Sequence, residues 1–190
     1  GVPSSFTLEL PPYRRPQIGQ VVVRSLLDRT LFVLGRAAAV AAPAGLLLWI
    51  LANVTWGDAT LLAHCAGFLD PLGRAMGMDG VILLAFLLGS PANEIVVPVM
   101  IMAYMASGSL AELSLPQLHQ LLLENGWTWL TALCTILFSL MHWPCTTTLL
   151  TIHRETKSLK WTLVSLMLPT LCGAFLCFLT AAAARLLGAV

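Results

Sequence analysis

Two short groups of polar and helix-breaking residues interrupt the most apolar parts of this sequence, and their side chains could do chemistry. The first group is Gly89-Ser90-Pro91-Ala92-Asn93-Glu94, and the second is His142-Trp143-Pro144-Cys145-Thr146. In hydrocarbon, each unpaired backbone N–H or C=O costs several kcal/mol, so irregular backbone survives there only inside protein or beside water. Paired interruptions of this kind are typical of binding sites in membrane transporters.

Glu94 is the most costly residue of the first group. A charged side chain at the centre of a membrane helix costs about 2.5–3.5 kcal/mol on insertion scales, which favours a functional role. The alternative is that Glu94 only stabilises the start of the second half-helix through the helix dipole, with Ser90 or Asn93 as the cap. We expect a functional role, because a cap does not require membrane depth. Ser90 and Asn93 are then polar groups on the same path.

Cys145 is the corresponding residue of the second group. Its thiol lies at the predicted start of a half-helix, where the dipole favours thiolate, a transient ligand for a borderline metal such as Fe²⁺. The alternative is an inert, small apolar residue. His142 could reach the same space or could be structural. The hydroxyl of Thr146 could replace ion hydration or could bond back to its own helix.

Composition sets the fold class. The chain has 190 residues, of which 58% are hydrophobic and 10% are charged, and its mean hydropathy is +0.86. An ordinary soluble domain has about 25% charged residues, so we predict an all-α, polytopic membrane bundle with two interrupted helices. The net charge is +1, which gives no electrostatic support for a nucleic-acid partner. Motifs of nucleotide hydrolases, serine hydrolases and zinc proteases are missing, so we predict no enzyme activity.

The spacing of apolar residues, prolines and glycines predicts the order of elements. Residues 1–17 are predicted to be an interfacial linker, and residues 18–190 a membrane domain. Within that domain we expect the following elements: an amphipathic surface helix (18–34), a spanning helix (37–54) kinked at Pro43, an amphipathic interfacial helix (59–78), a broken element (81–105) with a second irregularity at Pro98, an exposed excursion with one short helix (107–126), a half-helix leading to the second break (127–140) and a final spanning helix (161–187).

Three motifs in this order resemble a known family. They are the proline-rich stretch from Pro3 to Pro16, the stretch Gly89-Ser90-Pro91-Ala92-Asn93-Glu94-Ile95, and the stretch from His142 to Ile152. In order and spacing they resemble the bacterial ferrous iron transport protein B (FeoB) family, over essentially the whole chain. The chain looks like the C-terminal part of that family's membrane domain, including its second gate-type segment. Ser90 departs from the bulky residue that is frequent in the family's first gate motif.

The resemblance implies Fe²⁺ uptake across the bacterial inner membrane by a multi-pass protein. It places Asn93 and Glu94 in a gate and Cys145 on the iron path, so that Cys145 and Glu94 would be transient metal ligands. Fe²⁺ is then the transported substrate, and no cofactor is expected to be bound by this chain. The implied partners are an N-terminal GTP-binding domain, a first membrane half and the lipid bilayer, and a homo-oligomer is compatible with the pattern.

Two other functions fit the same residues. A carrier half for an organic, nucleoside-like solute could use Ser90, Asn93 and Glu94 as hydrogen-bonding groups. A structural or assembly subunit would need the breaks only to bend helices for packing, and substitution of Glu94 would then lower protein abundance rather than transport.

Overall fold

The computed structural model describes residues 19, 23–24, 27, 30–110 and 113–188. The predicted linker 1–17 and most of the predicted surface helix 18–34 lie outside these residues. The chain divides into two compact units, Gly1–Ala37 and Ala38–Val190. Every candidate site residue belongs to the second unit.

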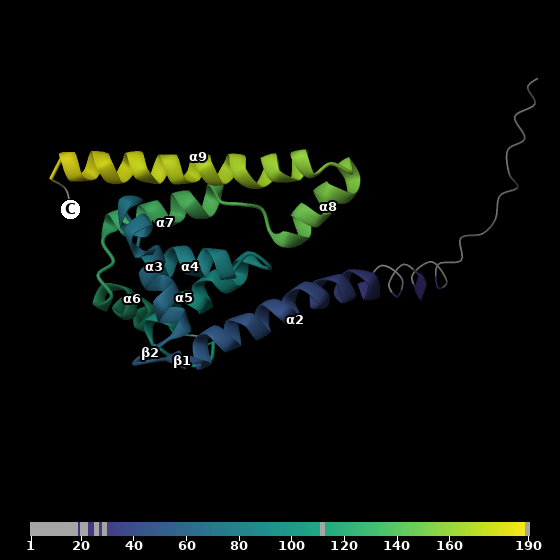
Figure 1. Cartoon of the computed structure of the whole chain (residues 1–190), viewed down its shortest axis with the longest axis horizontal. Helices are drawn as coiled ribbons and strands as arrows, with labels where there is room; N and C mark the ends of the chain where they lie inside the picture. Colours follow the sequence, from purple (N-terminus) through teal and green to yellow (C-terminus); the bar gives the residue numbers. More distant parts are fainter. Residues whose placement is uncertain (1–18, 20–22, 25–26, 28–29, 111–112, 189–190) are drawn as a thin grey trace, which may run out of the picture. The chain divides into compact units, whose positions relative to one another are not determined.

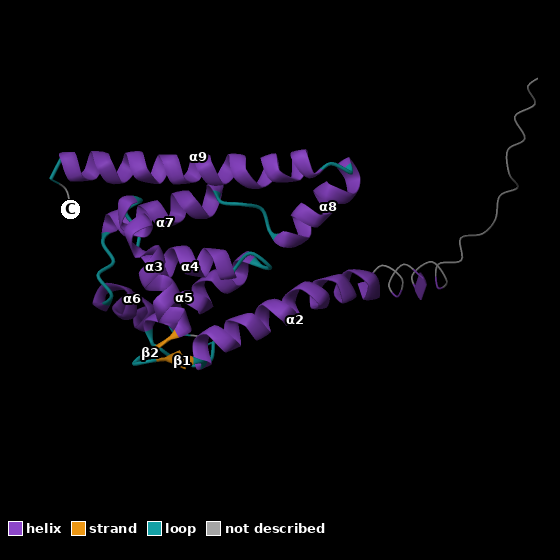
Figure 2. Ribbon diagram, in the orientation of Figure 1, coloured by secondary structure: helices purple, strands orange, loops and turns teal. Residues whose placement is uncertain are grey.

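Helices dominate the described residues, which confirms the predicted all-α class (Figures 1 and 2). Their bounds are Leu31–Asn53 (α2), Leu61–Ala75 (α3), Gly80–Leu88 (α4), Val96–Tyr104 (α5), Leu115–Glu124 (α6), Trp129–Met141 (α7), Thr146–Thr156 (α8) and Leu159–Leu186 (α9). A 3₁₀ turn, η2, covers Asn93–Ile95, and a small antiparallel hairpin pairs β1 (Thr55–Trp56) with β2 (Ala59–Thr60).

Three helical segments of the described residues are long and apolar enough to cross a membrane. They are Val33–Asn53, Trp129–Thr156 and Leu159–Leu186, and the pair α3 and α4, bent by 111°, would make a fourth. Helices with the length and composition of the spans predicted at 37–54 and 161–187 are therefore present. Helix α2 runs through Pro43 as one element. Large apolar side chains are exposed along α2 and α9, as expected for helices that face lipid.

The first broken element has the predicted form. Helix α4 ends at Leu88, four irregular residues follow, and the chain becomes helical again through η2 and α5. The prediction of a second irregularity at Pro98 is wrong. Pro98 is the third residue of α5, and an N–H at that position has no partner within the helix, so proline is tolerated without a break.

Helix α3 occupies most of the range predicted for an amphipathic helix (59–78). Its buried face contains Leu62, Ala66 and Gly73, and it packs against α4. The contact with α4 is very close at Gly80, where an added Cβ would lie 1.9 Å from the carbonyl oxygen of Ala66. Glycine is therefore required at position 80 to let the two helices cross.

The later elements also follow the prediction. Helix α6 is the short helix of the 107–126 excursion, and α7 leads to the second break. Helix α7 packs beside α9 (Figure 1), and the thiols of Cys134 and Cys177 are fully buried between them. Buried residues of α2, α3, α4, α5, α7 and α9 form the core, which includes the two half-helices that end at the breaks, α4 and α7.

Candidate functional site

The first break leaves the backbone of Ser90 outside the helix ladder. Gly89 ends α4 by donating its N–H to Ala85 (2.8 Å), and Ser90 donates its N–H to Leu87 (3.3 Å). An added Cβ at Gly89 would lie 2.4 Å from the side chain of Val96, so glycine lets α5 approach the end of α4. The carbonyl oxygen of Ser90 is not used by α4 or α5 and can accept hydrogen bonds from elsewhere.

The second break is an extended segment between α7 and α8. His142 leaves α7 with extended backbone (φ −71°, ψ 177°) while its N–H still donates to Phe138 (2.7 Å). Cys145 is the N-cap residue of α8, as predicted, and its thiol lies 3.1 Å from the hydroxyl of Thr147 and 3.0 Å from that of Thr148. The thiol therefore lies at the positive end of a helix beside two hydroxyl groups.

The two breaks contact each other directly. Thr146 donates both its backbone N–H (2.9 Å) and its hydroxyl (3.2 Å) to the carbonyl oxygen of Ser90. His142 Nε2 lies 3.3 Å from Oδ1 of Asn93, which makes a second link between the breaks. Backbone groups freed from one helix are thus paired by the other, which is how irregular backbone can persist at membrane depth.

His142 is held by ring contacts as well as by Asn93. Its Nδ1 lies 2.8 Å from the carbonyl oxygen of Ser139, and ring centroids of Phe86 and Trp143 lie 5.0 and 5.8 Å away. A cavity of about 190 Å³ adjoins this cluster, with Asn93, His142 and Ser139 among its polar lining. His142 therefore packs as a structural residue and also lies at the contact between the two breaks.

Glu94 lies in the 3₁₀ turn η2 and is exposed. It makes no hydrogen bond or ion pair with another described residue. Neither Glu94 nor Cys145 lines the 190 Å³ cavity. Of the six predicted site residues, four are in contact across the two breaks: Ser90 with Thr146, and Asn93 with His142. The carboxylate of Glu94 and the thiol of Cys145 take no part in these contacts. Among the described residues, no group of three or more His, Cys, Asp or Glu side chains could hold a metal ion.

Sequence reasoning missed a second polar junction, formed by Asp79, Tyr104 and Trp127. Asp79 caps α4 by accepting from the N–H of Ile82 (2.7 Å), and it also accepts from the hydroxyl of Tyr104 (2.5 Å). Trp127 donates its indole N–H to the same hydroxyl (2.9 Å). This junction connects the start of α4, the end of α5 and the segment before α7. The only local sequence signal for this junction is the pair Asp79-Gly80 before an apolar run, which indicates the start of a helix.

The model of the Gate family, described as nucleoside recognition, matches residues 34–159, about two-thirds of the chain. Both breaks and all six predicted site residues fall in the matched range. No solved structure matches the chain.

Curated relatives that match the chain include proteins named Fe(2+) transporter FeoB. The protein from Synechocystis is 29% identical over 86% of this chain, that from Staphylococcus aureus is 26% identical over 92%, and that from Leptospira interrogans is 26% identical over 84%. Each match covers 26% of the relative, so the chain spans about a quarter of their length. These matches confirm the resemblance seen in the sequence motifs, and the chain belongs to the Gate family.

Proposed function

We propose that this chain forms one gate half of a membrane transporter for ferrous iron. The observation that carries the proposal is the direct contact between the two helix breaks, through Ser90 with Thr146 and Asn93 with His142. The similarity to Fe(2+) transporters over most of the chain supports Fe²⁺ as the substrate.

The proposed path uses weak ligands that act in sequence. Cys145 offers a sulfur at a helix N-terminus, Glu94 offers an exposed carboxylate, and the carbonyl of Ser90 offers an oxygen when Thr146 releases it. Conduction requires binding that is strong enough for entry and weak enough for exit, which such scattered single ligands allow. In the described conformation the Ser90 carbonyl is occupied by Thr146, so this state is a closed gate in the proposal.

The same proposal places the chain in the bacterial inner membrane as a multi-pass segment. Its partners would be a GTP-binding domain and a first membrane half, because the relatives are about four times longer than the matched region. The GTP-binding domain would couple or regulate transport, and the gate half itself would carry no catalysis. A homo-oligomer is compatible with this arrangement.

Uptake of radiolabelled Fe²⁺ tests the residue assignments. In cells that express the transporter containing this chain, Cys145→Ser and Glu94→Gln should each lower the uptake rate per molecule about fivefold, equivalent to about 1 kcal/mol in the barrier. Matched controls are Cys172→Ser, at an exposed thiol on α9, and Glu124→Gln, at an exposed carboxylate on α6. Unchanged uptake for both path variants would refute the assignments, whereas reduced abundance with normal uptake per molecule would favour the structural-subunit function.

A nucleoside carrier is the second candidate, because the family model is described as nucleoside recognition. The cavity beside His142 offers Asn93 and Ser139 for hydrogen bonds and Phe86 for stacking. Its volume of about 190 Å³ is below the roughly 300 Å³ at which small-molecule pockets usually begin, which favours an ion. If nucleosides competed for transport by this protein and Fe²⁺ had no effect, the nucleoside carrier would become the preferred function.

A further inference from the structure

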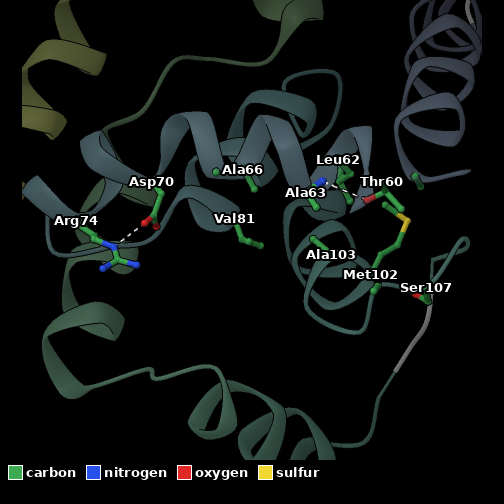
Figure 3. Close-up of a pocket in the computed structure, with 13 residues that line it drawn as sticks. Thr60, Leu62, Ala63, Ala66, Asp70, Arg74, Val81, Met102, Ala103 and Ser107 are labelled. Atoms are coloured by element: carbon green, nitrogen blue, oxygen red, sulfur yellow. Dashed lines mark hydrogen bonds and ion pairs between the residues drawn. The ribbon is translucent and has the colours of Figure 1, made fainter. Parts of the chain in front are cut away.

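A groove of about 350 Å³ lies along helix α3, away from the two breaks (Figure 3). Small residues of three helices form much of its wall, including Ala66 and Gly67 of α3 and Ala103 of α5, so the middle of the groove is mostly apolar. Its lining extends from Thr60 to Arg74, and 14 helical steps correspond to about 21 Å. This length is comparable to the roughly 15 Å of acyl chain in one leaflet of a bilayer.

The Arg74 end of the groove presents positive charge outward. The side chain of Arg74 is 77% exposed and its Nε pairs with Asp70 (2.6 Å), so most of the guanidinium group is accessible to solvent. The exposed guanidinium of Arg185 donates to the carbonyl oxygen of Arg74, which brings a second cation to this end.

The two carboxylates near Arg74 are less exposed than its guanidinium and are engaged in hydrogen bonds. Asp70 is partly buried and also accepts from the N–H of Gly80 (3.2 Å). Asp79, in the adjoining polar junction, accepts from the hydroxyl of Tyr104 and from the N–H of Ile82. The most exposed charged groups at this end are therefore guanidinium groups, which bind phosphate through paired N–H donors.

We propose that this groove binds one phospholipid, with an acyl chain along α3 and the phosphate against Arg74 and Arg185. A mostly apolar groove, long enough for an acyl chain and ending at exposed guanidinium groups, matches a molecule that has an anionic head and a long apolar tail. The site is separate from the Ser90–Thr146 junction, so the proposal does not depend on the substrate of the gate.

Gly67 allows a direct test. An added Cβ there meets no atom within 4 Å, so a larger side chain starts in open space, and we expect the leucine of Gly67→Leu to occupy part of the groove. Gly45→Leu is the matched control, because Gly45 lies within helix α2, also has open space and does not line the groove. Arg74→Gln removes the phosphate contact at an exposed side chain, where folding should be unaffected.

The protein is reconstituted in vesicles of phosphatidylethanolamine and phosphatidylglycerol, extracted in mild detergent and analysed by native mass spectrometry. The unmodified protein and Gly45→Leu should each retain one phospholipid per chain. Gly67→Leu should lose it, and Arg74→Gln should weaken retention about tenfold, as expected for one charged hydrogen-bonded contact. Thermal unfolding midpoints near that of the unmodified protein will show that the variants fold.

Equal retention by all four proteins would overturn the proposal, and so would equal losses in Gly67→Leu and Gly45→Leu. Inorganic phosphate distinguishes a lipid from a simple anion. Phosphate that binds equally to the unmodified protein and to Gly67→Leu, with no retained lipid in either, would show an anion site and would also overturn the phospholipid assignment.

Discussion

The link between Asn93 and His142 gives a quantitative prediction about the junction of the breaks. His142 Nε2 lies 3.3 Å from Oδ1 of Asn93, and the two residues are 49 positions apart in the sequence. Hydrogen bonds between membrane helices average about 0.6 kcal/mol in double-mutant cycles, with a maximum near 1.7. We expect a coupling free energy in this range, which corresponds to a factor of about 3 to 18 in the unfolding equilibrium constant.

The cycle uses Asn93→Ala, His142→Phe and the double variant. Phenylalanine keeps a ring against Phe86 and Trp143 while it removes both ring nitrogens, so most of the packing is retained. The free energy of unfolding is measured by SDS titration of the protein in detergent micelles. The matched control cycle pairs Asn93→Ala with Cys172→Ser and should give less than about 0.5 kcal/mol, as for independent sites. A coupling no larger than that of the control cycle would refute a direct link between the breaks.

Three further substitutions test the close helix contacts at Gly89 and Gly80 and the hydrogen bond between Tyr104 and Asp79. Gly89→Ala should lower the free energy of unfolding by about 1–3 kcal/mol, because its Cβ would lie 2.4 Å from a side chain of α5, whereas Gly45→Ala has open space and should be neutral or stabilising in SDS unfolding. Gly80→Ala should prevent accumulation of folded protein, since its Cβ would lie 1.9 Å from a backbone oxygen of α3; normal yield on size-exclusion chromatography would contradict the close crossing. Tyr104→Phe should cost about 1–3 kcal/mol by leaving Asp79 with one partner fewer, and an unchanged thermal midpoint would show that this hydrogen bond contributes little.

The elements could be predicted from the sequence because their signals are local. Apolar runs fix the helices, and Ser90-Pro91 and Trp143-Pro144 fix the breaks, since proline disfavours helical backbone before it and lacks an N–H. Pro98 misled the prediction because proline disrupts only a helix interior, and the exact start of α5 depends on how η2 packs. Helix ends are set by tertiary contacts as well as by composition.

The partners of the site residues could not be predicted in the same way. The residue types in the two breaks do not determine which groups come into contact, because the contacts depend on how α4, α5 and α7 pack against one another. Ser90 contacts Thr146 through its backbone carbonyl, and a pattern of side chains cannot predict which backbone oxygen will accept a hydrogen bond. Asp79 and Tyr104 lie 25 residues apart and meet only because α4 and α5 return to the same end. The predicted ion-path roles of Glu94 and Cys145 stay predictions until uptake is measured.

The central claim is that the two breaks meet and form a closed gate. The most direct test is Fe²⁺ uptake by the double variant Ser90→Cys with Thr146→Cys, before and after mild oxidation. Because Thr146 lies against the backbone of Ser90, we predict a rapid cross-link that stops uptake, and reduction that restores it. Full uptake while the cross-link is in place would contradict the account.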